Sequence, residues 1–191
     1  MPHFEPGKIV KTTKLKNGQA LVIRYPRWSD LQQVTDYINC LSQEHTFIRF
    51  SGEKISLKEE TEFFGHVFTT IELGDMVQLH AVIDNQIVGV SSIERNTTSK
   101  KRSLHVGIFG ISIAIEHRSL GIGQILAQTV INEVKWRLEG LRLITLSVYE
   151  PNVVALELYT KLGFVEAGTI PGHILHRGEY VGQVTMYLEL D

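Results

Sequence analysis

The feature that most constrains the fold is a strand–helix unit near the middle of the chain. Ser103–Ile115 is apolar at successive positions, as expected for a strand that is buried on both faces of a sheet. Gly121–Glu139 follows after a short polar turn, and its apolar residues recur at helical spacing: Ile122, Ile125, Leu126, Val130 and Val134. A buried strand that leads directly into an amphipathic helix predicts a central sheet with helices packed on it.

The other segments extend this α/β pattern along the chain. The expected strands are Ala20–Arg24, Met76–Ile83, Ile87–Glu94, Ser103–Ile115, Leu141–Val148, Val165–Ile170 and Val181–Leu190. The expected helices run from Ser29 or Asp30 to about Ser42, from the capping box Ser56/Glu59 to about Gly74, over Gly121–Glu139 and over Asn152–Leu162. Hairpin-linked strands followed by βαβ units predict a mixed sheet flanked by helices.

Composition excludes several classes of protein. The 191 residues include 19 Lys and Arg against 21 Asp and Glu, so the chain lacks the basic excess that is typical of a nucleic-acid binder. A hydrophobic content of 43% is too high for intrinsic disorder. Cys40 is the only cysteine, which rules out a disulfide framework and a cysteine-based zinc cluster. Without an apolar signal segment or a run of about 18 apolar residues, we expect a cytoplasmic protein with no membrane or nucleic-acid partner.

Residues 1–17 differ from the rest of the chain. They carry Lys8, Lys11, Lys14 and Lys16 with little apolar content, which favours a solvated N-terminal extension over an arm that binds a partner. Residues 18–191 show no linker, so they are expected to form a single domain.

A candidate anion site lies where the central strand leads into the following helix. Gly121 and Gly123 open this helix, where free N–H groups and the helix dipole favour a phosphate, and Arg118 adds a positive charge beside it. The two glycines alone are equally consistent with a tight turn that binds nothing. A dinucleotide-binding oxidoreductase is disfavoured, because its fingerprint needs a small residue where Leu126 stands.

A second motif narrows the interpretation. Asn152, Ala155, Leu158, Tyr159, Gly163 and Phe164 match N-x-x-A-x-x-L-Y-x-x-x-G-F, and Arg118, Gly121 and Gly123 match R-x-x-G-x-G upstream. In this order the two motifs resemble the GNAT superfamily of acetyl-CoA-dependent N-acetyltransferases over about residues 76–190. The resemblance implies a mixed, largely antiparallel sheet of about seven strands flanked by four helices.

The same resemblance implies how acetyl-CoA, the only cofactor expected, would bind. The backbone of Ile111, Ser112 and Ile113 would pair with the pantetheine arm, and Asn152 would hydrogen-bond the same arm. The pyrophosphate would lie beside Arg118, on backbone N–H groups of Ser119, Leu120, Gly121, Ile122, Gly123 and Gln124. Tyr159 would be the general acid that protonates the departing CoA thiolate. No metal is expected, since His173 and His176 have no accompanying carboxylates.

The general base is less well indicated. Members of the family carry a glutamate at one of two strand positions, which are Gly107 and Ser147 here. His105 would face the same side of a regular strand as Gly107 and is the first candidate, although a packed strand histidine fits equally well. Glu94 on the preceding strand is the second candidate, with a surface charge as its alternative. Deprotonation through ordered water is a third route.

The resemblance therefore implies an enzyme that moves an acetyl group from acetyl-CoA to a primary amine by direct attack. The acceptor could be a protein amino group, an amino acid or a polyamine, and a homodimer is left open. A non-catalytic acyl-CoA-binding or sensing module is the alternative. The absence of the usual base favours that module, while the presence of Tyr159 and Asn152 argues against it.

Overall fold

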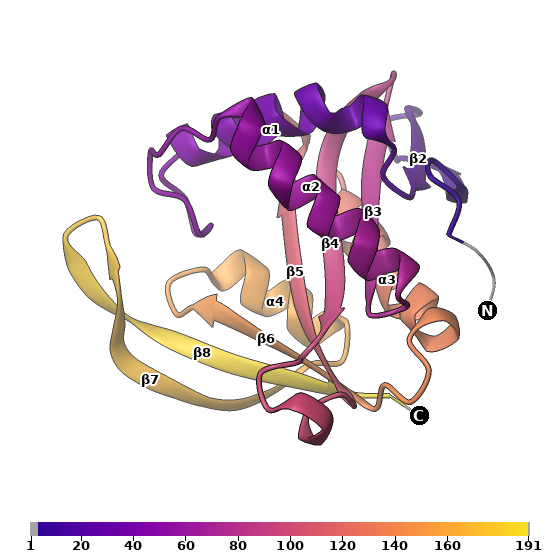
Figure 1. The fold of residues 1–191 in the computed structure, drawn as a ribbon. Helices are drawn as coiled ribbons and strands as arrows, with labels where there is room; N and C mark the ends of the chain where they lie inside the picture. The colour runs from indigo at the N-terminus through magenta and orange to yellow at the C-terminus, as the bar shows by residue number, and fades with distance from the viewer. Residues whose placement is uncertain (1–3, 191) are drawn as a thin grey trace.

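Helices cover both faces of an eight-stranded sheet in the computed structural model, which describes residues 4–190 (Figure 1). The strand order is β1-β2-β3-β4-β5-β6-β8-β7, and every neighbouring pair is antiparallel except β5 and β6. The strands are β1 (Ile9–Lys14), β2 (Ala20–Arg24), β3 (Met76–Ile83), β4 (Gln86–Arg95), β5 (Val106–Ile113), β6 (Leu143–Tyr149), β7 (Val165–His176) and β8 (Glu179–Glu189). The helices are α1 (Leu31–Gln43), α2 (Leu57–Glu72), α3 (Ile122–Arg137) and α4 (Val153–Lys161).

The expected mixed sheet with four flanking helices is confirmed, and two local signals explain where elements begin and turn. The Ser56 side chain accepts a hydrogen bond from the Glu59 N–H while Glu59 reaches back to the Ser56 N–H, so the capping box starts α2 as predicted. Asp84 and Asn85 both have positive φ, 48° and 64°, which is the turn that the β3–β4 hairpin requires.

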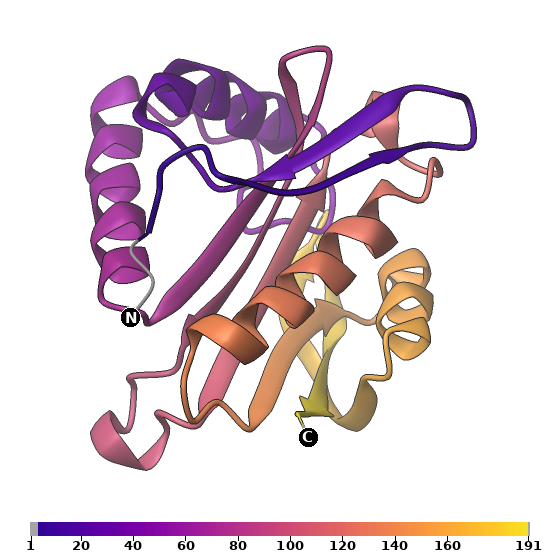
Figure 2. The same cartoon turned by 90° about the vertical axis from the view of Figure 1, so that its right-hand side faces the viewer.

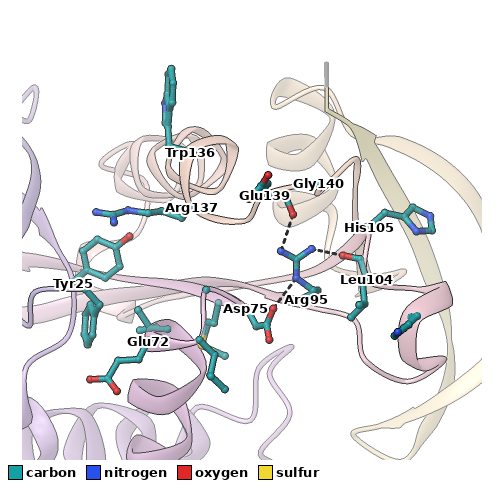
Figure 3. A pocket seen from close by; sticks show the side chains of 16 residues that line it. Tyr25, Glu72, Asp75, Arg95, Leu104, His105, Trp136, Arg137, Glu139 and Gly140 are labelled. Atoms are coloured by element: carbon teal, nitrogen blue, oxygen red, sulfur yellow. Dashed lines mark hydrogen bonds and ion pairs between the residues drawn. The ribbon is translucent and has the colours of Figure 1, made fainter. Parts of the chain in front are cut away.

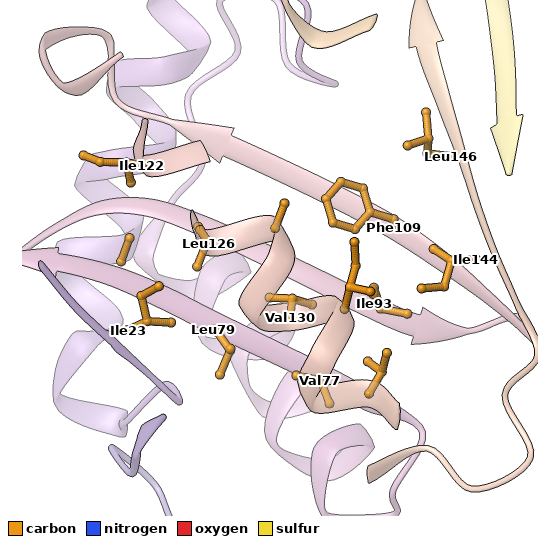
Figure 4. Packing of buried hydrophobic residues seen from close by; sticks show 14 of the residues in the cluster. Ile23, Val77, Leu79, Ile93, Phe109, Ile122, Leu126, Val130, Ile144 and Leu146 are labelled. Atoms are coloured by element: carbon orange, nitrogen blue, oxygen red, sulfur yellow. The ribbon is translucent and has the colours of Figure 1, made fainter. Parts of the chain in front are cut away.

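Helix α3 supplies most of the core on one face of the sheet. Its stripe of Ile122, Leu126, Val130 and Val134 is at most 1% exposed and packs over β3, β4 and β5, against residues that include Ile93 (Figure 4). Each such side chain contributes roughly 1.5–3 kcal/mol through burial. This packing holds the N-terminus of α3 rigidly against the end of β5.

Helices α1 and α2 lie on the opposite face, as the turned view shows (Figure 2). Beneath them Arg24 and Asp30 form a bidentate pair, with N–O distances of 2.6 and 2.8 Å, and His80 Nδ1 lies 3.3 Å from Asp30 Oδ2. All three side chains are buried. Burial alone would raise the pKa of Asp30, but its contacts with His80 and Arg24 outweigh burial and hold that pKa well below its usual range.

The prediction of a solvated arm before residue 18 was wrong for Ile9–Lys14, because this segment forms β1 and pairs antiparallel with β2. The segment sets Lys11 and Lys14 among β-branched residues, a composition that suits an edge strand exposed to water. The sheet therefore has eight strands instead of about seven. The strand expected over Val165–Ile170 continues to His176 as β7, with an irregularity in its pairing between Ile170 and Ile174, and the hairpin turns at Arg177 and Gly178.

The parallel pair β5–β6 opens into a gap. The two strands pair only from Val106 to Ile108 on β5, although β5 continues to Ile113 and β6 to Tyr149. Beyond Ile108, β5 remains paired with β4 on its other side. Its edge toward β6 is therefore open over the last five residues, at the point where the chain enters α3.

Candidate active site

A cavity of about 1160 Å³ occupies the gap between β5 and β6. Helices α1 and α2 contribute to its wall from one face of the sheet, and the start of α3 and α4 contribute from the other. The structure brings most of the expected cofactor residues together here: Ile111, Ser112, Ile113, Arg118, Ser119, Gly121, Gly123, Gln124, Asn152 and Tyr159. The side chains of Leu120 and Ile122 instead pack into the core, so only their backbone could serve a ligand.

The loop before α3 has the backbone that a phosphate site needs. Ser119 and Gly121 have φ values of 63° and 81°, and Gly121 is the N-cap of α3 without a side-chain capping bond. The N–H groups of the first turn of this helix are therefore not capped by a side chain. At Gly123 a Cβ would lie 3.5 Å from Leu158 and 3.8 Å from Ile113, so the missing side chain keeps the approach between them open.

The sequence suggested that Arg118 presents a free positive charge at the loop, but the structure shows that its charge is paired. Its guanidinium donates to the Ile113 carbonyl at 2.9 Å and to Glu44 Oε2 at 2.5 Å. Glu44 follows the last turn of α1 and is only 12% exposed at its side chain. The pair ties the loop to α1, so Arg118 shapes the loop and most of its charge is neutralised locally.

Asn152 is the N-cap of α4. Its side-chain oxygen accepts the Ala155 N–H at 3.3 Å, which satisfies one free donor of the helix. The side-chain amide group can still donate toward the cavity that Asn152 lines. Capping and contact with a ligand are therefore compatible at this residue.

Tyr159 is held by aromatic contacts on the inner side of α4. Its ring meets Phe109 edge-on with centroids 5.8 Å apart and lies 5.9 Å from Phe164, and the residue is 8% exposed. Within residues 4–190 its hydroxyl has no hydrogen-bond partner. Burial raises the pKa of Tyr159 to about 12, so the hydroxyl stays protonated near neutral pH.

The wall formed by α1, α2 and the segment between them completes the cavity on the other face of the sheet. Tyr37 on α1 shares a hydrogen bond of 2.9 Å with Ser112, and Glu60 on α2 and Gln78 on β3 line the same space. Residues 46–50, which lie between the two helices, also contribute. The outer rim is an aromatic cluster in which Phe47 stacks on His176 of β7 and meets Tyr149 edge-on.

Comparison with known proteins identifies this arrangement. The sequence profile described as the Acetyltransferase (GNAT) family matches residues 37–164, which include α2, the loop before α3 and both motifs. The chain belongs to the GNAT acetyltransferase family.

Relatives agree with this membership. An L-amino acid N-acetyltransferase of Escherichia coli, AaaT, is 34% identical over 104 residues, which are 54% of this chain and 62% of that enzyme. The chain thus aligns with less than two thirds of that relative's length. Two solved structures share the fold with a TM-score of 0.78 each. One is a ribosomal-protein-alanine N-acetyltransferase of Brucella melitensis, with 20% identity over 88% of this chain and 99% of that one. The other is yncA of Salmonella typhimurium with acetyl-CoA, with 17% identity over 90% of this chain and 94% of that one.

His105 does not line this cavity. The strand begins at Val106, so His105 lies in a turn and not on the strand face that alternation had given it. It borders a different cavity, where Arg95 binds Asp75 and the carbonyls of Leu104 and Glu139, and its ring points away from Arg95 (Figure 3). Nothing in this position brings His105 to the substrate cavity.

The other expected base positions are equally unsuited. Glu94 does not line the cavity and lies 3.4 Å from His66 on α2. At Gly107 a Cβ would lie 2.6 Å from Ile93, so a glutamate cannot be accommodated there without repacking the core. Ser147 does line the cavity, but a hydroxyl is not a base at neutral pH. The sequence interpretation missed Glu60, a buried carboxylate on α2 that lines this cavity.

Two further observations concern the described residues. Within residues 4–190, no group of three or more His, Cys, Asp or Glu side chains is placed to hold a metal ion. No helix in the same range is both long enough and apolar enough to cross a membrane.

Proposed function

We propose that the protein is an N-acetyltransferase that moves the acetyl group of acetyl-CoA to the primary amine of a small acceptor, with an α-amino acid as the favoured class. The observation that carries this proposal is one cavity that joins three features: the uncapped start of α3, the open edge of β5 and the side chain of Tyr159. A transferase needs these three parts to bind a phosphate-bearing thioester and to release its thiol.

Acetyl-CoA fits this cavity along its length. Its pyrophosphate would bind the N–H groups from Ser119 to Gln124 at the start of α3. Its pantetheine arm would then lie along the open edge of Ile111–Ile113 like an added strand, with Asn152 donating from the other side. Backbone N–H groups on β5 would polarise the thioester carbonyl.

Tyr159 is the proposed donor to the departing thiolate. A tyrosine with a pKa of about 12 holds its proton until charge develops on the sulfur, because the thiol of a cysteine-like group has a pKa near 8.5. Complete proton transfer to a free thiolate would be uphill by about 3.5 pKa units, or roughly 5 kcal/mol. Tyr159 would therefore act chiefly by hydrogen-bonding the sulfur as the bond to carbon breaks.

The amine must lose a proton before it can attack. For a lysine-like amine with a pKa near 10.4, deprotonation at pH 7 costs about 4.6 kcal/mol, so the site must provide an acceptor for that proton. The neutral nitrogen attacks the thioester carbon, so that a C–N bond forms, the C–S bond breaks and the released thiolate is protonated. The amide and free CoA are then the products.

An amino acid is favoured over a polyamine by the wall of the cavity. Arg49 lines the cavity and has no ion-pair partner within the described part of the chain, so it could bind a carboxylate. The partial similarity to an L-amino acid N-acetyltransferase supports the same class. A polyamine or a protein amino group remains the alternative acceptor.

The test is release of CoA thiol from acetyl-CoA in the presence of amino acids, polyamines and peptides with free N-termini. We expect turnover with amino acids, and a higher KM for them in Arg49→Ala with little change for polyamines. Tight binding of acetyl-CoA without turnover of any amine would instead support the acyl-CoA-binding module.

A further inference from the structure

One buried carboxylate in the acceptor half of the cavity makes no hydrogen bond or ion pair within residues 4–190. Glu60 is 2% exposed, and its Oε1 atom is buried without a hydrogen-bond partner within residues 4–190. Its immediate neighbour Glu59 serves the capping box of α2, so the helix start does not require a second carboxylate. An unpaired carboxylate in such a position destabilises a fold, and a native structure that retains one needs another reason for it.

The sheet beneath α2 offers a polar floor next to this carboxylate. Register places Gly110 of β5, Ser92 of β4 and Gln78 of β3 directly opposite one another, so their side-chain positions share one face of the sheet. Helix α2 packs on β3, and all three residues line the cavity together with Glu60. Glycine at position 110 leaves room above β5, beside the segment expected to carry the thioester.

Burial makes Glu60 a weaker acid than an ordinary glutamate. Burial raises the pKa of Glu60 to about 7. Burial is the cause of this shift, and no charged neighbour adds to it. Apart from the tyrosines, the other charged or ionisable side chains on the cavity wall are Arg49, His117, Arg118, Glu157 and Lys161.

The titratable groups on the elements around α2 do not supply a competing base. On α1 and β3, burial raises the pKa of Tyr37 and lowers that of His80, so both stay uncharged at neutral pH. On β4, Glu94 is engaged with His66. Glu60 is thus the carboxylate of this face that is both in the cavity and without a partner.

We propose that Glu60 is the general base of the transferase: its carboxylate binds the ammonium group of the acceptor and takes a proton from it. This role rests on the function proposed above and places the base on α2, outside the two strand positions where the family usually carries one. A base with a pKa near the working pH combines a large ionised fraction with useful basicity. The unpaired Oε1 is then explained as the position that the acceptor's ammonium fills.

The step balances without any further reactant. One proton moves from the ammonium nitrogen to Glu60, directly or through one water, and the nitrogen lone pair forms a bond to the thioester carbon. The C–S bond breaks, and its electron pair leaves with the CoA sulfur. The second proton of the nitrogen ends on the thiolate, which Tyr159 hydrogen-bonds as it leaves, and Glu60 returns its proton to solvent.

The test compares wild type with Glu60→Gln across pH, using the amine that the wild type acetylates best. Wild-type kcat/KM should rise with pH to a plateau above about pH 7, as Glu60 ionises. Glu60→Gln should lose this acidic limb and its plateau, and its rate should instead rise with pH in proportion to the fraction of neutral amine. At pH 7 we expect kcat to fall by about 10²–10⁴, with unchanged affinity for acetyl-CoA.

Two further variants separate catalysis from structure. Glu62→Gln makes the same chemical change on an exposed residue of the same helix and should behave as wild type. Glu60→Asp keeps a carboxylate and should retain an acidic limb at a reduced rate. Melting temperatures provide a readout without activity: Glu60→Gln should gain stability over wild type as pH rises from 5 to 8, because only the wild type ionises a buried carboxylate.

The outcomes are distinct. A Glu60→Gln variant with the wild-type rate and pH profile overturns this assignment and leaves the proposed function intact. A Glu60→Gln variant in which only KM rises and the acidic limb remains also overturns the assignment, since Glu60 would then bind the amine without acting as its base. A wild type that binds acetyl-CoA and acetylates no amine overturns the proposed function, and the assignment of Glu60 with it.

Discussion

Substitution of Gly121 by alanine tests where the phosphates of acetyl-CoA bind. Gly121 has φ of 81°, and a Cβ there would meet no atom within 4 Å, so the substitution adds strain without a clash. Left-handed backbone costs a residue other than glycine roughly 1–2 kcal/mol. For a chain of this size, 1 kcal/mol corresponds to about 2–4 °C, so the melting temperature should fall by about 2–8 °C.

The same substitution should weaken cofactor binding. Relief of the strain rotates the peptide groups at the start of α3, which are the donors assigned to the pyrophosphate. Loss of one hydrogen bond to a charged group costs about 1.5–3 kcal/mol, which corresponds to a Kd for CoA raised by roughly 10- to 150-fold. Isothermal titration calorimetry with CoA measures the affinity, and thermal unfolding measures the stability of the same samples.

Gly140, beyond the other end of α3, provides a matched control. Its φ is 77°, and a Cβ there would also meet no atom within 4 Å. Gly140→Ala should therefore lower the melting temperature by a similar amount and leave the Kd for CoA unchanged. A folded Gly121→Ala protein with wild-type affinity, or an equal loss of affinity in both variants, would refute the placement of the phosphates.

Three other substitutions test the site and the fold beneath it. Tyr159→Phe should lower kcat by about 10²–10⁴ with nearly unchanged acetyl-CoA affinity, measured where chemistry limits the rate; full activity would reduce Tyr159 to a packing residue. Asp30→Asn should lower the free energy of unfolding by about 3–5 kcal/mol, because buried Arg24 loses its charged partner; denaturant titration measures it. His80 has its pKa lowered by burial, so its contribution to stability is present above about pH 6.5 and is lost as pH falls below that value. His80→Gln should remove this part of the pH dependence, and an unchanged slope between pH 7 and pH 5 would contradict it.

The sequence predicted well those features that depend on neighbours along the chain. Gly121 and Gly123 lie where spacing predicted them, and Asn152 caps the helix that carries Tyr159. Each of these assignments needs only local information, such as a cap, a turn or one helical repeat. Strand β1 was missed because its lysines, which protect an exposed edge, look like a solvated arm when no neighbouring strand is known.

The proposed base, Glu60, depends on contacts between distant segments. His105 failed because alternation was extended past Val106, where the strand begins. Glu60 lies in the first turn of a helix, where acidic residues are common because they favour the helix dipole. One indication was present in the sequence. Glu60 continues the apolar stripe of Phe64, Phe68 and Ile71 at helical spacing, where a charged residue is unexpected. Only packing of α2 on the sheet distinguishes a buried carboxylate there from an exposed one.

The short pairing between β5 and β6 has a consequence for how the two substrates meet. Because the strands separate beyond Ile108, the sheet has a slit, and the cavity reaches helices on both of its faces through it. A thioester that enters from the α3–α4 side and an amine that enters from the α1–α2 side can be bound at the same time without sharing an entrance. The acetyl group can then pass straight between them, and no side chain of the protein has to carry it in a covalent intermediate.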